Sequence, residues 1–216
     1  MKTTSILLVL VFTLSFESVN AQSNSDSLQV ETEFNNLEEA MKNPSRVYRL
    51  NLSNQKNTLS DSLWARFTNL EYLSLKNDHL KRIPAGIGLL KNLKVLDLSG
   101  NDFEMLPLSF GKLKNLQELY LNDDKNFQFN KSIQILSKLP NLKSLHVDND
   151  NLKKLPPKIT LLSHLERLYL NNNHFKAIPV EIKGLKNLTF VDFHHNDYRP
   201  KFDQTLNFGN GIRFNF

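Results

Sequence analysis

Seven segments of the chain repeat one order of apolar and polar positions. Each segment begins at an apolar residue, and its fourth and sixth residues are apolar too. The first positions are Val47, Leu70, Leu93, Leu116, Leu142, Leu165 and Leu188, so successive segments begin 23, 23, 23, 26, 23 and 23 residues apart. A near-constant period of this length predicts stacked units, each of which buries its apolar face against its neighbours.

The alternation inside each segment predicts a short β-strand. In the stretch VLDLS at 95–99, Leu96 and Leu98 alternate with more polar residues. Successive side chains of a strand point to opposite faces, so the two leucines face one side and their neighbours the other. The pattern therefore predicts one short strand in each repeat, with the leucines in the core and the opposite face in water.

The second half of most units carries a proline after an apolar residue. Proline lacks a backbone N–H and biases the preceding residue towards extended geometry, so these returns are expected to be irregular or tightly turned. The pairs are Ile83-Pro84, Leu106-Pro107, Leu155-Pro156 and Ile178-Pro179. The first return, residues 59–69, has no proline and is expected to hold a short helix.

The complete pattern, LxxLxLxxNxLxxLPxxIxxLxxL, resembles that of the leucine-rich repeat proteins over residues 47–200, and most closely the exported bacterial type. The resemblance implies an α/β solenoid. It would be a horseshoe with a concave parallel β-sheet and a convex side of irregular or short helical segments. The resemblance also implies a non-catalytic protein that binds another protein.

The ninth position of every repeat is polar. A carboxamide at this place can donate to and accept from backbone groups of the turn, and stacked copies form a ladder. A carboxylate can only accept unless it is protonated, so the ladder is expected to be weaker or rearranged at the three aspartates. The ladder residues are Gln55, Asp78, Asn101, Asp124, Asp150, Asn173 and Asn196.

The first residues have the features of a secretory signal peptide. Lys2 precedes the apolar run at 6–14, and the small residue Ala21 marks the expected cleavage site. The alternative is a membrane anchor, but the run falls short of the ~20 apolar residues that a spanning helix needs. We therefore expect an exported protein that is periplasmic, on the cell surface or secreted.

The remaining ends are interpreted as caps of the repeat array. Asn35 and Glu38 are spaced as a capping box for a helix that ends before Pro44, which could instead dock a partner. Apolar residues alternate around glycines 209 and 211, as in a hairpin. The predicted parts are a signal peptide at 1–21, a flexible leader at 22–33, an N-terminal helical cap at 34–46, seven repeats at 47–200 and a C-terminal hairpin cap at 201–216.

The fourth repeat carries three extra residues and lacks the apolar-proline pair. An insertion in a repeat array lies in a loop beside one face, where function can be located. Alternatively, its apolar residues refill the core as a short helix, and we favour this interpretation. These residues are Phe127, Phe129, Ile133, Leu136 and Leu139.

The water-facing strand positions are the third, fifth and seventh of each repeat. From the fourth repeat onwards they include aromatic side chains and an arginine, the residue types that dominate binding energy at protein interfaces. The alternative is that they are ordinary strand formers on a solvated face. The candidate partner-binding residues are Glu118, Tyr120, His146, Asp148, Arg167, Tyr169, Phe190, Asp192 and His194.

Other chemistry is not indicated. The chain has no cysteine, which excludes disulfides and thiolate chemistry. The histidines at 146, 194 and 195 lie near carboxylates in the pattern, but an open sheet excludes no water, so we expect no enzyme, metal or cofactor. The net charge of +5 comes mostly from lysines in the returns, so we expect no nucleic-acid partner and at most peripheral membrane contact. The alternative function is an envelope- or surface-associated structural protein, attached through the basic convex side or the C-terminal hairpin.

Overall fold

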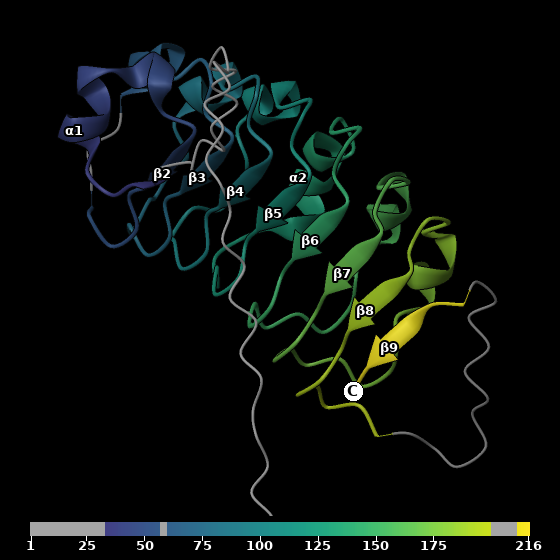
Figure 1. The fold of residues 1–216 in the computed structure, drawn as a ribbon. Helices are drawn as coiled ribbons and strands as arrows, with labels where there is room; N and C mark the ends of the chain where they lie inside the picture. The colour runs from purple at the N-terminus through teal and green to yellow at the C-terminus, as the bar shows by residue number, and fades with distance from the viewer. Residues whose placement is uncertain (1–32, 57–59, 200–210) are drawn as a thin grey trace, which may run out of the picture. The chain divides into compact units, whose positions relative to one another are not determined.

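Nine short strands form one parallel sheet in the order of the chain (Figure 1). The computed structural model describes residues 33–56, 60–199 and 211–216. The strands are β1 (Glu33–Phe34), β2 (Arg49–Asn51), β3 (Tyr72–Ser74), β4 (Val95–Asp97), β5 (Glu118–Tyr120), β6 (Ser144–His146), β7 (Arg167–Tyr169), β8 (Phe190–Asp192) and β9 (Arg213–Asn215). The predicted strand in each of the seven repeats is thus confirmed, from β2 to β8.

The register places equivalent repeat positions side by side. Leu96 of β4 pairs with Leu119 of β5, and Asp97 pairs with Tyr120. The same correspondence continues across the three extra residues of the fourth repeat, because Tyr120 pairs with His146 of β6. Columns of side chains therefore run across the sheet, one neighbour about 4.8 Å from the next.

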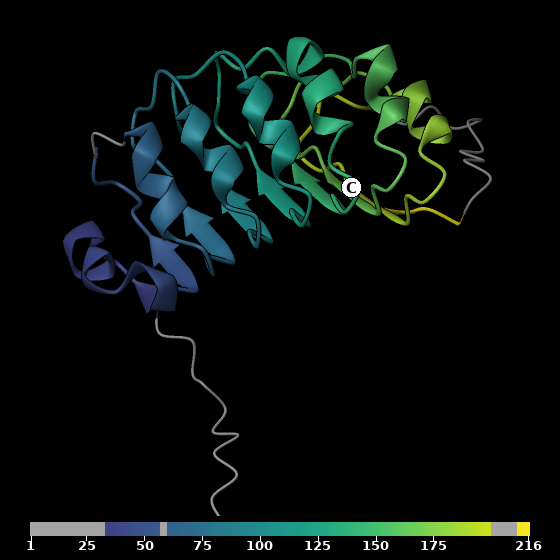
Figure 2. The same cartoon turned by 90° about the horizontal axis from the view of Figure 1, so that it is seen from above.

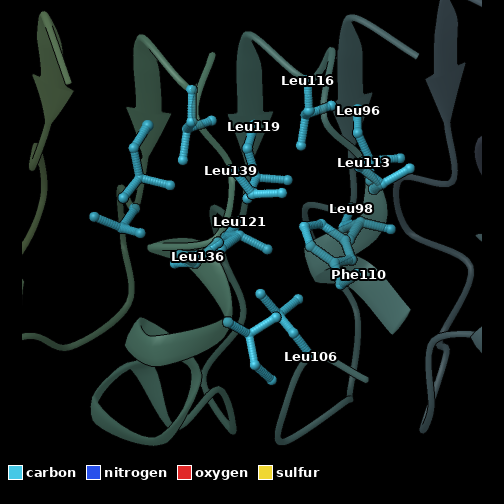
Figure 3. Packing of buried hydrophobic residues seen from close by; sticks show 14 of the residues in the cluster. Leu96, Leu98, Leu106, Phe110, Leu113, Leu116, Leu119, Leu121, Leu136 and Leu139 are labelled. Carbon is cyan, nitrogen blue, oxygen red and sulfur yellow. The ribbon is translucent and has the colours of Figure 1, made fainter. Parts of the chain in front are cut away.

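The leucines of the strands meet the returns in one continuous core (Figure 3). Leu96, Leu98 and Leu119 are fully buried, and Phe110 from the return packs beside them. Burial of each such side chain stabilises the fold by about 1.5–3 kcal/mol. The prediction that the leucines of each strand face the core is therefore confirmed.

The returns lie on the side of the core opposite the sheet (Figure 2). Each proline of the apolar-proline pairs directly precedes a short 3₁₀ helix. The prediction of tightly turned returns is therefore confirmed. The first return also forms a short helix, as expected. The 3₁₀ helices are η1 (Pro44–Arg46), η2 (Asp61–Arg66), η3 (Ala85–Leu89), η4 (Leu108–Lys112), η5 (Pro157–Leu161) and η6 (Val180–Gly184).

The insertion in the fourth repeat forms helix α2 (Phe129–Leu136). Ile133 and Leu136 are fully buried, and Leu139 is nearly so. In Figure 3, Leu136 lies beside Leu121 of the preceding turn. The extra residues therefore refill the core, and the interpretation of this segment as a core helix is confirmed.

A left-handed turn follows the strand of each of the seven repeats. The eighth position has a positive φ at Asn54, Asn77, Gly100, Asp123, Asn149, Asn172 and His195. Asparagine, aspartate and glycine tolerate this conformation best. A Cβ added at Gly100 would lie 2.0 Å from Asn77 Oδ1, so a side chain at this position would require Asn77 to shift.

The N-terminal cap differs from the prediction in two ways. It contains a short strand, and its helix begins one residue later than predicted. Helix α1 (Leu37–Lys42) begins after Asn36, whose side chain accepts from the backbone N–H of Glu39 at 3.1 Å, so the proposed capping box at Asn35 is wrong. Glu33 and Phe34 pair with β2 as β1, which satisfies backbone groups at the edge of the sheet. Glu33 is therefore not part of a flexible leader. The predicted signal peptide and the rest of the leader lie outside the described residues.

The C-terminal segment extends the sheet. Val191 of β8 pairs in parallel with Phe214 of β9, and the Phe193 N–H donates to the carbonyl of Asn215 at 2.8 Å. The two arms of a hairpin are antiparallel, whereas the neighbour observed for β9 is parallel. The arm predicted within 201–210 lies outside the described residues. Within the described ranges, no helix is long and apolar enough to cross a membrane.

Candidate functional site

Four aromatic rings from adjacent strands form a continuous row on the concave face. The centroids of Tyr120 and His146 lie 3.9 Å apart with an interplanar angle of 17°, and those of His146 and Tyr169 lie 3.9 Å apart at 8°. Tyr169 meets Phe190 edge-on, with centroids 5.5 Å apart. The register makes this row possible, because the fifth positions of β5, β6 and β7 pair directly. We call these four residues the aromatic row.

Glu118 holds the first two rings in place. Its Oε1 atom accepts from the hydroxyl of Tyr120 at 2.8 Å and lies 2.9 Å from Nε2 of His146. The hydrogen bond with His146 is the main cause that holds the pKa of Glu118 below its usual value. Burial and the bond to Glu118 raise the pKa of Tyr120. Glu118 is therefore an ionised acceptor, and the rings are fixed before any partner arrives.

His146 is less available than its position on the sheet predicts. Only 8% of its surface is exposed, because the two tyrosine rings cover both of its faces. Tyr120 and Tyr169 are partly exposed and present the outer surface of the stack. The fifth-position residues are therefore not all exposed to solvent. His146 mainly separates the rings of Tyr120 and Tyr169.

The two predicted aspartates of this face make hydrogen bonds within the chain. Asp192 Oδ1 accepts from Asn215 at 2.9 Å and also contacts His194 Nδ1, while Oδ2 accepts from Asn171 at 2.9 Å. Asp148 accepts from the Asn171 N–H at 2.7 Å, and its burial raises its pKa. These carboxylates organise the ends of the strands and are not displayed as free acids.

A shallow pocket opens at the C-terminal end of the aromatic row. Its volume is about 520 Å³, and it is lined by Arg167, Tyr169, Thr189, Phe190 and Arg213. Arg213 was not among the residues predicted from the sequence. The signal that could have identified it is the period itself, since Arg213 follows Phe190 by one repeat and pairs with it.

At the N-terminal end of the concave face, the polar and charged side chains have partners within the chain. The guanidinium of Arg49 lies 4.1 Å from the ring centroid of Tyr72 and 3.2 Å from a carboxylate oxygen of Glu33. Asn51 also donates to Glu33, at 3.1 Å. At this end of the face, Arg49 and Tyr72 therefore already have partners within the chain.

The ladder at the ninth position is formed by asparagines and aspartates, whereas Gln55 is exposed and its Nε2 donates to the carbonyl of Asn35 at 2.7 Å. The Nδ2 group of Asn101 donates to the carbonyls of Leu75 at 2.9 Å and Leu98 at 2.6 Å, and its Oδ1 accepts from the N–H of Leu80. Asn173 and Asn196 each donate to backbone carbonyls in the same way. The asparagines therefore join consecutive turns through both atoms of the carboxamide.

The aspartates of the ladder keep only the accepting half of these bonds. Asp78, Asp124 and Asp150 each accept backbone N–H groups through Oδ1, while Oδ2 is buried without a hydrogen-bond partner. Burial raises the pKa of Asp124 and of Asp150 to about 8. At neutral pH these two carboxyls are therefore largely protonated, and a protonated carboxyl can donate where asparagine donates.

Two histidines of the concave face are each paired with one carboxylate. His146 is engaged by Glu118 and His194 by Asp192, as separate pairs. Among the described residues, no group of three or more histidine, aspartate or glutamate side chains could hold a metal ion.

Comparison with known proteins agrees with this architecture. A family model described as a leucine-rich repeat region matches residues 42–151, and a second leucine-rich repeat model matches residues 140–197. The structure resembles a leucine-rich repeat protein of Leptospira interrogans with a TM-score of 0.53 and 28% identity, over 77% of this chain and 54% of that one. It also resembles the Toll–Spatzle complex of Drosophila with a TM-score of 0.65 and 18% identity, over 76% of this chain and 22% of that one, a likeness of fold alone. A search of curated protein sequences finds no match.

Proposed function

This chain belongs to the leucine-rich repeat family, whose members are generally non-catalytic interaction modules, and from that premise we propose that its concave face binds another protein. The observation that carries the proposal is the aromatic row, Tyr120, His146, Tyr169 and Phe190. Tyrosine and arginine are enriched at the energetic centres of protein interfaces. The row lies on four neighbouring strands and has Arg167 beside it.

Preorganisation supports this face as a binding surface. The rings are stacked on one another, and Glu118 fixes two of them by hydrogen bonds. Immobilising a free side chain on binding costs about 0.5–1.5 kcal/mol, and most of that cost is already met in the folded chain. Seven strands spaced about 4.8 Å apart span roughly 30 Å, which suits one partner's share of a standard interface.

The test is capture of a partner by the immobilised chain and by two matched variants. Tyr120→Ala with Tyr169→Ala removes the outer rings of the aromatic row. Tyr72→Ala removes the tyrosine that Arg49 covers at the N-terminal end of the concave face, so it controls for the loss of an aromatic side chain from that face. We expect the first variant to lose crosslinked partner from a host extract while keeping its circular dichroism spectrum, and the control to retain it. Equal capture by all three proteins would refute the concave site.

An attachment role for the convex side predicts a different result. Exposed lysines line the returns, including Lys154 and Lys158. If the chain is an envelope-associated structural protein, purified chain binds envelopes in a salt-sensitive manner, and the tyrosine substitutions leave that binding unchanged.

Export is a separate part of the proposal and rests on residues 1–21. Mass determination of the chain recovered from its host tests it, since cleavage after Ala21 leaves a product beginning at Gln22.

A further inference from the structure

Two arginines flank one aromatic ring at the end of the sheet. Arg167, Phe190 and Arg213 are the first residues of β7, β8 and β9, and each pairs with the next. The guanidinium carbon of Arg213 lies 4.9 Å from the centroid of Phe190. The two arginine backbones are therefore roughly 10 Å apart, with the ring between them and the pocket of about 520 Å³ above it.

A similar contact between one arginine and one ring occurs at the opposite end of the sheet, where the chain supplies its own carboxylate. Arg49 lies over Tyr72 as Arg213 lies over Phe190. Glu33 of β1 is in register with Arg49 and contacts its guanidinium at 3.2 Å. In the described part of the chain, Arg213 has no such carboxylate, and neither do the Nη atoms of Arg167.

The acids that could neutralise the pocket are engaged elsewhere. Glu166 pairs with Lys143 at 2.8 Å, and Asp192 is held by Asn171, Asn215 and His194. The charge of Arg167 helps to lower the pKa of Glu118, but the direct partners of that carboxylate are Tyr120 and His146. Within the described residues, the side chain of Arg167 donates through Nε to Ser144 at 2.8 Å, and its Nη atoms have no hydrogen-bond partner.

We propose that this pocket binds the carboxylate of an aspartate or glutamate in an acidic segment of the protein partner, an inference that rests on the proposed function of the concave face. A planar guanidinium binds a carboxylate through two parallel hydrogen bonds, and two guanidinium groups surround this pocket. Phe190 and Tyr169 provide an apolar wall for the methylene groups of the acidic side chain. The partner's acid supplies Arg213 with the kind of carboxylate that Glu33 supplies to Arg49.

The experiment selects peptides from a random dodecapeptide library on the immobilised full-length chain and measures their affinities by fluorescence anisotropy. Arg167→Gln with Arg213→Gln removes both guanidinium groups while keeping similar side-chain size. Lys154→Gln with Lys158→Gln removes the same charge from the convex side and is the matched control. We expect selected peptides to be enriched in aspartate and glutamate. They should bind the arginine variant about tenfold to a hundredfold more weakly and the lysine variant unchanged.

The remaining outcomes separate the inference from the proposed function. Peptides that bind the arginine variant normally but lose binding to the Tyr120→Ala, Tyr169→Ala variant would overturn the carboxylate pocket and leave the concave face as a binding site. Peptides that tolerate both variants would overturn both. A final experiment measures the binding of phosphatidylglycerol vesicles to the chain and to the arginine variant. If the vesicles bind only when the arginines are present and no acidic peptide is selected, the pocket recognises a lipid phosphate and the inference is wrong.

Discussion

Replacing Asp124 and Asp150 by asparagine is expected to stabilise the solenoid, and to do so increasingly as the pH rises. Asp124 is 1% exposed, and its Oδ1 accepts the N–H of Asn101 at 2.7 Å. The N–H of Asp124 donates to Oδ1 of Asp150 at 2.8 Å. Both Oδ2 atoms are buried without a partner. Asparagine at these places adds the donating group that Asn101 uses in the neighbouring turn.

The direction of the pH dependence follows from the raised pKa values. Each carboxyl has a pKa of about 8 in the folded chain, against roughly 3.9 in an unfolded one. Between these values the folded state binds more protons than the unfolded state, so the free energy of unfolding falls as the pH rises. The contribution is fully present below about pH 4 and is lost as the pH rises through about 8.

The magnitude of this effect is set by proton linkage. A single carboxyl changes the free energy of unfolding by up to about 1.4 kcal/mol for each pH unit in this window. The charge of Asp124 raises the pKa of Asp150, so the effects of the two single substitutions are not expected to add up to the effect of the double substitution. A donor restored to a buried polar network stabilises by about 1–3 kcal/mol.

Urea denaturation followed by circular dichroism at pH 5, 6, 7 and 8 measures the effect at constant ionic strength. Asn173→Asp is the reverse substitution, because it removes donors to Val147 at 2.9 Å and Leu170 at 3.0 Å. We expect this variant to lose stability, most of all at pH 8. If the wild-type chain and the double asparagine variant show the same slope of stability against pH, the buried aspartates are not protonated and the reasoning is wrong.

Three further substitutions test the core, the turns and the aromatic row. Leu119→Ala is expected to lower the free energy of unfolding by about 3–5 kcal/mol in urea denaturation, because Leu119 is fully buried; a loss below 1 kcal/mol would contradict its place in the core. Gly100→Ala is expected to cost about 1–3 kcal/mol and lower the melting temperature, since φ is 71° and the added Cβ meets Asn77; an unchanged melting temperature would exclude strain there. His146→Phe keeps a ring in the row but removes the hydrogen bond to Glu118. The pKa of Glu118 is then expected to rise in a carboxyl NMR titration. An unchanged pKa would exclude that hydrogen bond as the cause of the low value.

The period and the alternation determined the repeat units, the strand columns and most of the core. Leu96 and Leu98 identify a strand and its buried face without reference to any other part of the chain. The same reasoning placed Tyr120 and Tyr169 in one column, because a constant repeat length puts equivalent residues on neighbouring strands. The caps were predicted less well. The sequence of the N-terminal cap does not follow the repeat period. The C-terminal cap was interpreted without the period: Arg213 was assigned to a hairpin, although it follows Phe190 by one repeat.

Tertiary structure decided how these residues behave. The raised pKa of Asp150 depends on its burial and on the carboxyl of Asp124 in the preceding turn, which no local pattern describes. The covering of His146 by two rings and the contact of Arg213 with Phe190 also depend on side chains that come from different repeats. Apolar periodicity is a property of neighbouring positions in one unit, whereas pKa values and charge pairing depend on distances of a few ångströms between units.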